Sequence, residues 1–190
     1  MTKSAVSQAN VVTAAREPRP FLFLSPARLP LRHDPIDAAG RATLQAAAED
    51  AVPMLVRSLV NFTIERQNRR ALERGNPQPI ALSVLNRRRR AARAWLLAVL
   101  AGKVDGAARH AVASQWLPTL CGTGPDLRLA AAPARALVEF VRGAITACIF
   151  DEANENLLPH AKALHVLETV LSVHLAAVLQ VSRASRATAP

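Results

Sequence analysis

The chain contains no tyrosine, and aromatic residues make up only 4% of its 190 residues. A core must therefore be built mainly from Leu, Val and Ala, a mixture that favours helices over sheets. The alternating apolar and polar pattern of strands is missing, and so are internal repeats. These absences predict an all-α fold, a single-domain bundle of about five to six helices.

Recognisable catalytic motifs are also missing. The sequence shows no nucleophile beside a positioned base, no paired carboxylates in an apolar setting and no glycine-rich phosphate loop. Gly122 and Gly124 flank one threonine, but no strand precedes them and no Gly-Lys pair follows. We therefore expect a protein that is not an enzyme.

Metal-binding patterns are equally scarce. Cys121 and Cys148 are the only cysteines and form no CxxC pair, so we expect two buried or half-buried thiols in a reducing cytoplasm. The histidines at 160, 165 and 174 lack the spacing of three or four residues that places two ligands on one helix face. Residues 1–20 lack the apolar core of an export signal. The sequence thus predicts a cytoplasmic protein without a metal site.

Positive charge is in excess, and arginine supplies nearly all of it. The formal net charge is +10, from 24 basic and 14 acidic residues. Only Lys3, Lys103 and Lys162 are lysines. Such a balance indicates attraction to anionic partners, although a GC-rich genome gives the same arginine and alanine bias.

Apolar periodicity and helix start and stop residues predict where the helices lie. Pro53 either kinks the first helix or stands in the first turn of the second. Residues 1–33 should form a disordered or extended arm, residues 34–181 the helical domain, and residues 182–190 a basic tail. The predicted helices cover residues 34–50, 53–75, 80–101, 105–117, 134–150 and 156–181.

Two of these helices carry most of the apolar residues. The helix over 134–150 is apolar on most sides, which predicts that it lies at the centre of the bundle. The apolar segment 163–181 also contains His165, Glu168 and His174, and this amphipathic pattern favours a packed helix over a membrane span.

Four consecutive arginines, at positions 87–90, stand in the predicted helix 80–101. Because residues in a helix are 100° apart, four in a row cannot all face solvent. Leu85, Ala92 and Leu96 define the centre of the apolar stripe on this predicted helix. Arg89 falls inside the stripe and Arg88 at its edge, while Arg87 and Arg90 point outward. Arg89 should therefore snorkel, face a partner molecule, or pair with a carboxylate; Glu139 and Glu168 are the candidate carboxylates.

The function of this arginine cluster has three interpretations. It can be solvated or paired within the chain, it can bind a protein or another anionic ligand, or it can attract nucleic acid. Nucleic-acid binding would be non-specific, since aromatic stacking residues and a named DNA-binding motif are lacking. The residues concerned are Arg87, Arg88, Arg89, Arg90 and Arg93.

His174 is the one histidine in a strongly apolar setting, with Val170, Leu171 and Val178 at helical spacing. It could reach a buried pocket or a haem iron. A half-buried structural histidine is the interpretation that we favour.

The run WLLAVLAGKVD at residues 95–105 resembles the tryptophan, apolar pair, glycine and aspartate found between the middle helices of globin-coupled sensor domains and their non-haem relatives in bacterial stressosomes. The order of the later helices is similar, so the resemblance implies a globin-like arrangement over residues 40–181. Haem-binding members carry a proximal histidine after the glycine-aspartate turn. Here only His110 is available, and it stands too early, so the resemblance implies a domain that senses without haem.

The leading expectation is a non-enzymatic, cytoplasmic, bacterial regulatory or sensory protein that acts through a dimer or another protein interface. One alternative is a basic nucleic-acid-associated protein that uses the arginine-rich helix. The other is a globin-like protein that holds haem or a small ligand at His174.

Overall fold

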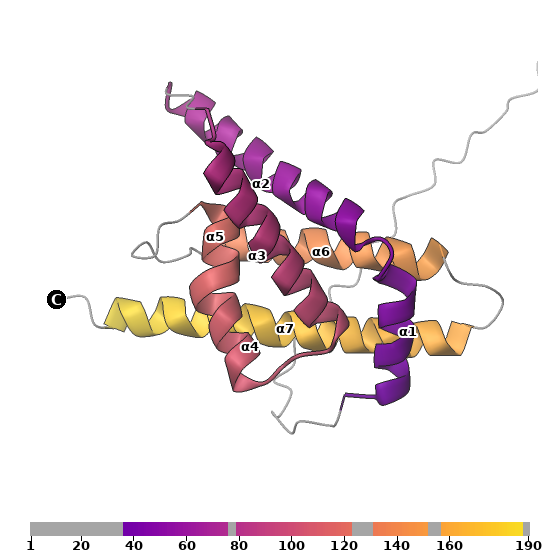
Figure 1. Ribbon diagram of the computed structural model, residues 1–190. Helices are drawn as coiled ribbons and strands as arrows, with labels where there is room; N and C mark the ends of the chain where they lie inside the picture. Colours follow the sequence, from indigo (N-terminus) through magenta and orange to yellow (C-terminus); the bar gives the residue numbers. More distant parts are fainter. Residues whose placement is uncertain (1–35, 76–78, 123–130, 152–156, 188–190) are drawn as a thin grey trace, which may run out of the picture. The chain divides into compact units, whose positions relative to one another are not determined.

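The computed structural model describes residues 36–75, 79–122, 131–151 and 157–187. All of them belong to Asp34–Pro190, the second of two units into which the chain divides. The predicted arm over residues 1–33 lies outside the described residues. Within the described ranges the secondary structure is helical without strands, which confirms the all-α prediction (Figure 1).

The helices in chain order are α1 (Ala38–Ala48), α2 (Val52–Glu73), α3 (Leu82–Leu100), α4 (Gly106–Ala111), α5 (Leu117–Cys121), α6 (Ala131–Asp151) and α7 (Leu157–Ala187), with a π-helical turn η1 (Val112–Trp116) between α4 and α5. Because α4, η1 and α5 follow one another without a break, the described chain forms six helical segments, as expected for a bundle of about five to six helices. The last helix continues to Ala187, beyond the predicted end at residue 181.

The first two helices begin at residues that suit the free N–H groups of a first helical turn in different ways. The Asp37 carboxylate accepts a hydrogen bond from the Ala39 N–H at 3.0 Å and caps α1, so this helix begins at Ala38 and not at residue 34. Pro53 stands in the first turn of α2, where a missing N–H costs nothing. The second of the two alternatives for Pro53 is therefore confirmed.

Pro118 lies inside a helix that was expected to end before it. Pro118 has no N–H to donate, and its ring would clash with the carbonyl four residues earlier in a regular α-helix. The π-helical turn η1 widens the helix just before this proline. Helical structure therefore continues to Cys121 and ends at Gly122, whose φ of 68° is left-handed.

The long C-terminal helix α7 takes the central position that the sequence assigned to α6. It packs against α1, α3, α4, η1 and α6, whereas α6 packs against α1, α2, α5 and α7. Figure 1 shows α7 running alongside α6 and beneath α1, α3 and α4. The prediction for α6 was wrong because several small residues of α6, and Phe150 near its C-terminal end, are exposed. By contrast, α7 buries a longer row of apolar side chains.

One segment of α7, Leu158–Ser182, has the length and mean hydropathy, 1.6, of a membrane-crossing helix. Its apolar residues are concentrated on the face that packs into the bundle. Buried side chains recur at helical spacing along this face: Ala163, Val166, Leu167, Val170, Leu171, His174, Ala177 and Val178. Packing of this face accounts for part of the apolar composition, since 39% of the most apolar window is buried within the bundle.

The crossing of α1 and α7 depends on a glycine. A Cβ atom built on Gly40 would lie 2.8 Å from the backbone oxygen of Lys162, so the two helices approach closer than any side chain permits. By contrast, a Cβ on Gly143, exposed in α6, would meet no atom within 4 Å.

We predict opposite effects for alanine at these two glycines. Gly40→Ala should lower the free energy of unfolding by about 1–3 kcal/mol, because the backbones must separate. Gly143→Ala should raise it by up to about 1 kcal/mol, because alanine is the better helix former. Denaturant unfolding of both variants measures the difference; equal effects would contradict the close helix crossing.

Candidate functional site

A buried histidine joins three parts of the bundle. The indole Nε1–H of Trp95 in α3 donates to Nδ1 of His174 in α7 at 3.2 Å. His174 Nε2 lies 2.8 Å from the backbone oxygen of Lys103, in the turn after α3. Because Nδ1 accepts from the indole, Nε2 carries the proton and donates to this carbonyl.

This network defines the chemistry available to His174. Both ring nitrogens are hydrogen-bonded, so neither is available to a haem iron. The side chain is fully buried, whereas the structural interpretation expected a half-buried histidine. Burial lowers the pKa of His174, and the Lys103 carbonyl and Asp105 oppose this shift. The imidazole is therefore neutral at pH 7.

The residues that carry the family resemblance have structural roles in the same region. Gly102 ends α3 with a left-handed φ of 65°, and its N–H donates to the Val99 oxygen at 3.0 Å. Asp105 caps α4 by accepting from the Ala108 N–H at 2.8 Å. Trp95, Gly102 and Asp105 together determine how the chain turns from α3 into α4.

The arginine that enters the core is Arg88 and not Arg89. Arg88 is 1% exposed, and Arg87, Arg89 and Arg90 are exposed. The prediction for Arg89 was wrong because it took Leu85 and Leu96 as the centre of the apolar stripe and left out Trp95. Trp95 is the largest buried side chain of α3, and Arg88 stands seven residues before it, on the same side of the helix.

The carboxylates expected to pair with the inward arginine pair elsewhere. Glu139 pairs with Arg142 within α6 at 2.5 Å, and Glu168 of α7 pairs with the same Arg142 at 2.8 Å, which links α6 to α7. In the part of the chain that the structure describes, neither forms an ion pair with Arg88.

The Arg88 guanidinium lies between α2, α3 and the end of α5. Its Nη2 donates to the side-chain oxygen of Gln67, whereas Nε and Nη1 have no hydrogen-bond partner within the described ranges. A Cβ on Gly122 would lie 2.5 Å from Nη2, so only glycine can pass this close. Burial lowers the pKa of Arg88, yet a guanidinium stays protonated at pH 7.

The nearby thiol does not compensate this charge. Burial raises the pKa of Cys121 to about 12, although the guanidiniums of Arg70, Arg66 and Arg88 act in the opposite direction. Cys121 is therefore a neutral thiol at physiological pH. Arg88 is a buried cation without a counter-ion among the described groups, an arrangement that costs several kcal/mol.

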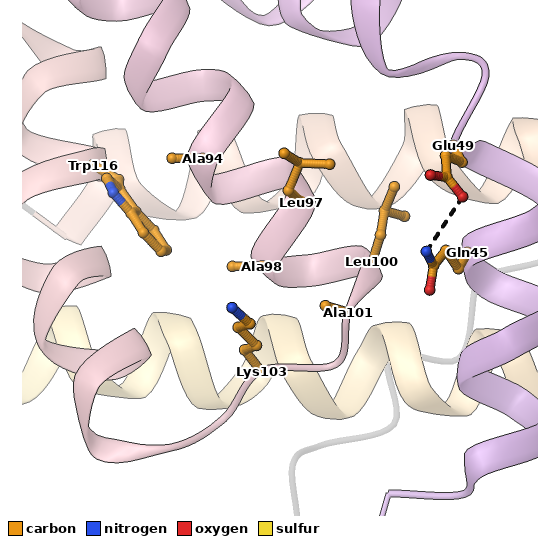
Figure 2. Close-up of a pocket in the computed structure, with 9 residues that line it drawn as sticks. All are labelled: Gln45, Glu49, Ala94, Leu97, Ala98, Leu100, Ala101, Lys103 and Trp116. Carbon is orange, nitrogen blue, oxygen red and sulfur yellow. Dashed lines mark hydrogen bonds between the residues drawn. The ribbon is translucent and has the colours of Figure 1, made fainter.

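The opposite face of α3 borders an open groove. Arg90, Arg93 and Leu97 follow one another at spacings of three and four residues, so they share the side of α3 that faces away from Arg88. Leu97 is 44% exposed. The groove, with a volume of about 470 Å³, lies between α1, α3 and η1 (Figure 2), and its lining comprises Gln45, Glu49, Ala94, Leu97, Ala98, Leu100, Ala101, Lys103 and Trp116.

The groove has an apolar floor and polar edges. Ala94, Leu97 and Ala98 line it from α3, and Figure 2 shows Trp116 and Lys103 beside them. At the other end, Gln45 donates to the Glu49 carboxylate at 3.3 Å. Sequence reasoning did not identify this groove, because its lining residues come from helices far apart in the chain.

The arginines of α2 and α3, and Arg74 directly after α2, are not neutralised by ion pairs with other described residues. Within the described ranges, the recorded ion pairs involve Arg142 and Lys162 and none of these arginines. The same ranges contain no group of three or more His, Cys, Asp or Glu side chains able to hold a metal ion. The arginines are Arg57, Arg66, Arg69, Arg70, Arg74, Arg87, Arg88, Arg89, Arg90 and Arg93.

Comparisons with protein-family models, curated proteins and solved structures give no match.

We predict that His174 makes stability fall on mild acidification. The folded protein holds His174 below its ordinary pKa of 6.5, so the unfolded chain takes up the proton first. This contribution is complete above pH 6.5 and is lost as pH falls below it, by up to about 1.4 kcal/mol between pH 7.5 and 5.5. Denaturant unfolding at both pH values should show a smaller change in His174→Gln. His165→Gln, an exposed histidine on the same helix, should keep the full change.

We further predict that Arg88 and Arg89 differ in their effect on stability. In a chloride buffer free of other anions, Arg88→Met should raise the free energy of unfolding by about 1–2 kcal/mol, because it removes an unpaired buried charge. Arg89→Met should change it by less than about 0.5 kcal/mol, as exposed positions usually do. Equal effects on thermal unfolding would show that Arg88 is not the inward arginine.

Proposed function

We propose that this chain is a non-enzymatic regulatory protein whose α3 groove binds an acidic, amphipathic helix of a protein partner. The observation that carries the proposal is the arrangement on the outer side of α3. The exposed Leu97 lines an apolar groove, and Arg90 and Arg93, which form no ion pair with any described residue, share its side of α3.

The groove provides the apolar part of such an interface. Leu97 and Trp116 offer the large apolar side chains that anchor protein contacts when a partner buries them. A volume of about 470 Å³ suits a few side chains of a docking helix. Helix-in-groove binding uses such an apolar channel with charges at its ends.

The arginines provide orientation and attraction. Arg93 precedes Leu97 by one helical turn, and Arg90 stands at the next position on the same face. A partner helix with acidic residues near one end would place its carboxylates against these guanidiniums. Such rim charges raise association rates and select the direction of docking.

A protein partner fits this surface better than a nucleic acid does. Stacking of bases requires exposed aromatic rings beside the basic residues. Within the described ranges Trp95 is buried among core residues, and Phe62 is half-buried and stacks on Phe140 with ring centroids 4.6 Å apart. Trp116 lies in the groove. The basic residues here would attract phosphates without reading a sequence.

A sensory role, a cytoplasmic location and a dimeric form belong to the same proposal. The sensory role follows from the resemblance of residues 95–105 to globin-coupled and stressosome sensor domains, and the cytoplasmic location follows from the cysteine usage of the sequence. In such a protein, binding of the partner at α3 would depend on the conformational state of the domain.

The proposal predicts a specific cross-link at position 97. When Leu97 is replaced by the photoreactive residue benzoylphenylalanine and the source cells are irradiated, we expect a discrete cross-linked adduct with a partner protein. The cross-linked segment of that partner should be an acidic amphipathic helix. Arg90→Glu with Arg93→Glu in the same chain should lower the yield by about tenfold or more. Mass spectrometry identifies the linked segment.

Two controls make the result decisive. In the first control, benzoylphenylalanine replaces Phe150, an exposed apolar residue of α6, and this variant should give no such adduct. Arg135→Glu, an exposed charge reversal on α6, should leave the yield from position 97 unchanged. An adduct with nucleic acid at position 97, or equal yields from positions 97 and 150, would contradict the proposal.

A further inference from the structure

Arg88 lies on the side of α3 opposite the proposed partner groove and has no part in that function. The residue is 1% exposed, and its Nε and Nη1 donate to no hydrogen-bond acceptor in the described chain. Guanidinium groups at such depth are found with carboxylates or phosphates, because planar donors unmatched by acceptors are costly. The free donors therefore indicate a missing acceptor.

The surroundings of Arg88 suit a small anion. Arg66 and Arg70, on the facing side of α2, act electrostatically on the same Cys121 thiol as Arg88 does. Arg66 and Arg70 stand one helical turn apart on α2, on either side in sequence of Gln67, the residue that contacts Arg88. The Cys121 thiol that they influence is neutral at physiological pH. Gln67 contributes a side-chain oxygen that already accepts from Nη2, whereas Nε and Nη1 are buried without an acceptor in the described chain.

Backbone geometry at the end of α5 allows close approach to these donors. Gly122 is exposed and adopts a left-handed conformation beside the guanidinium, and a Cβ there would lie 2.5 Å from Nη2 and displace it. Glycine at such a position is typical of sites where backbone lies close to a ligand.

We propose that Arg88, with Arg66 and Arg70, forms a binding site for a small oxyanion at the junction of α2, α3 and α5. The oxyanion would accept hydrogen bonds from Nε and Nη1 of Arg88 in a side-by-side pair. Arg66 and Arg70 would supply the remaining positive charge. Phosphate, sulfate and a carboxylate share this chemistry, and their geometry and charge distinguish them.

Thermal unfolding in phosphate, sulfate, acetate and chloride at equal ionic strength tests the site. At a phosphate concentration about 100 times the Kd, the melting temperature should rise by about 5–10 °C relative to chloride. Arg89→Met should show the same rise, and Arg88→Met should lose it. Since phosphate and sulfate also stabilise proteins generally, the difference between the two variants is the informative quantity.

The acetate arm separates the classes of oxyanion. A response to phosphate and sulfate with none to acetate supports a tetrahedral dianion, and a response to acetate alone supports a carboxylate. Either result supports the site. Equal responses of the unchanged protein in all four salts, or a full phosphate response in Arg88→Met, overturn it.

A second variant keeps the test valid if Arg88→Met does not fold. Gln67→Glu places a carboxylate where the Gln67 oxygen already meets Arg88. This variant should melt higher than the unchanged protein in chloride and lose most of its response to phosphate, because the built-in carboxylate replaces the anion. A phosphate response of undiminished size in Gln67→Glu overturns the proposal. The cross-link from position 97 does not depend on this site, so the two proposals fail independently.

Discussion

The hydrogen bonds of His174 are the constraint on which the rest of the bundle depends. They join α3 through the Trp95 indole and the α3–α4 turn through the Lys103 carbonyl to the central helix α7. A buried imidazole without these partners would cost about 1–3 kcal/mol for each unsatisfied group. Loss of either hydrogen bond would leave a buried polar group unsatisfied, so the three elements are held in one register.

The rotation of α3 follows from this register. With Trp95 directed at His174, the residue seven positions earlier, Arg88, must also face inward, and the opposite side of the helix must face outward. One helix therefore presents a buried guanidinium on one side and Leu97 with the exposed Arg90 and Arg93 on the other. The same hydrogen bond that stabilises the core thus positions both proposed binding surfaces.

The continuous helix α4–η1–α5 completes both surfaces. Its π-helical turn contains Trp116, which lines the groove, and allows Pro118 to follow without ending the helix. Its end places Cys121 and Gly122 beside Arg88. A helix that ended before Pro118, as the sequence suggested, would have removed the elements that surround the guanidinium.

Composition, periodicity and capping residues alone determined the helical class, the number of helices and most of their boundaries, because these depend on local backbone preferences and on the spacing of apolar residues. The apolar pattern placed Arg89 inward, one position away from Arg88, the arginine that is buried. A helical wheel treats all apolar residues alike, so it gives no extra importance to Trp95, which is hydrogen-bonded to His174 far along the chain. Only the tertiary structure decided which helix lies at the centre, which arginine is buried and where the groove opens. Each of these depends on contacts between residues far apart in the chain, such as Trp95 with His174 and Arg88 with Gln67.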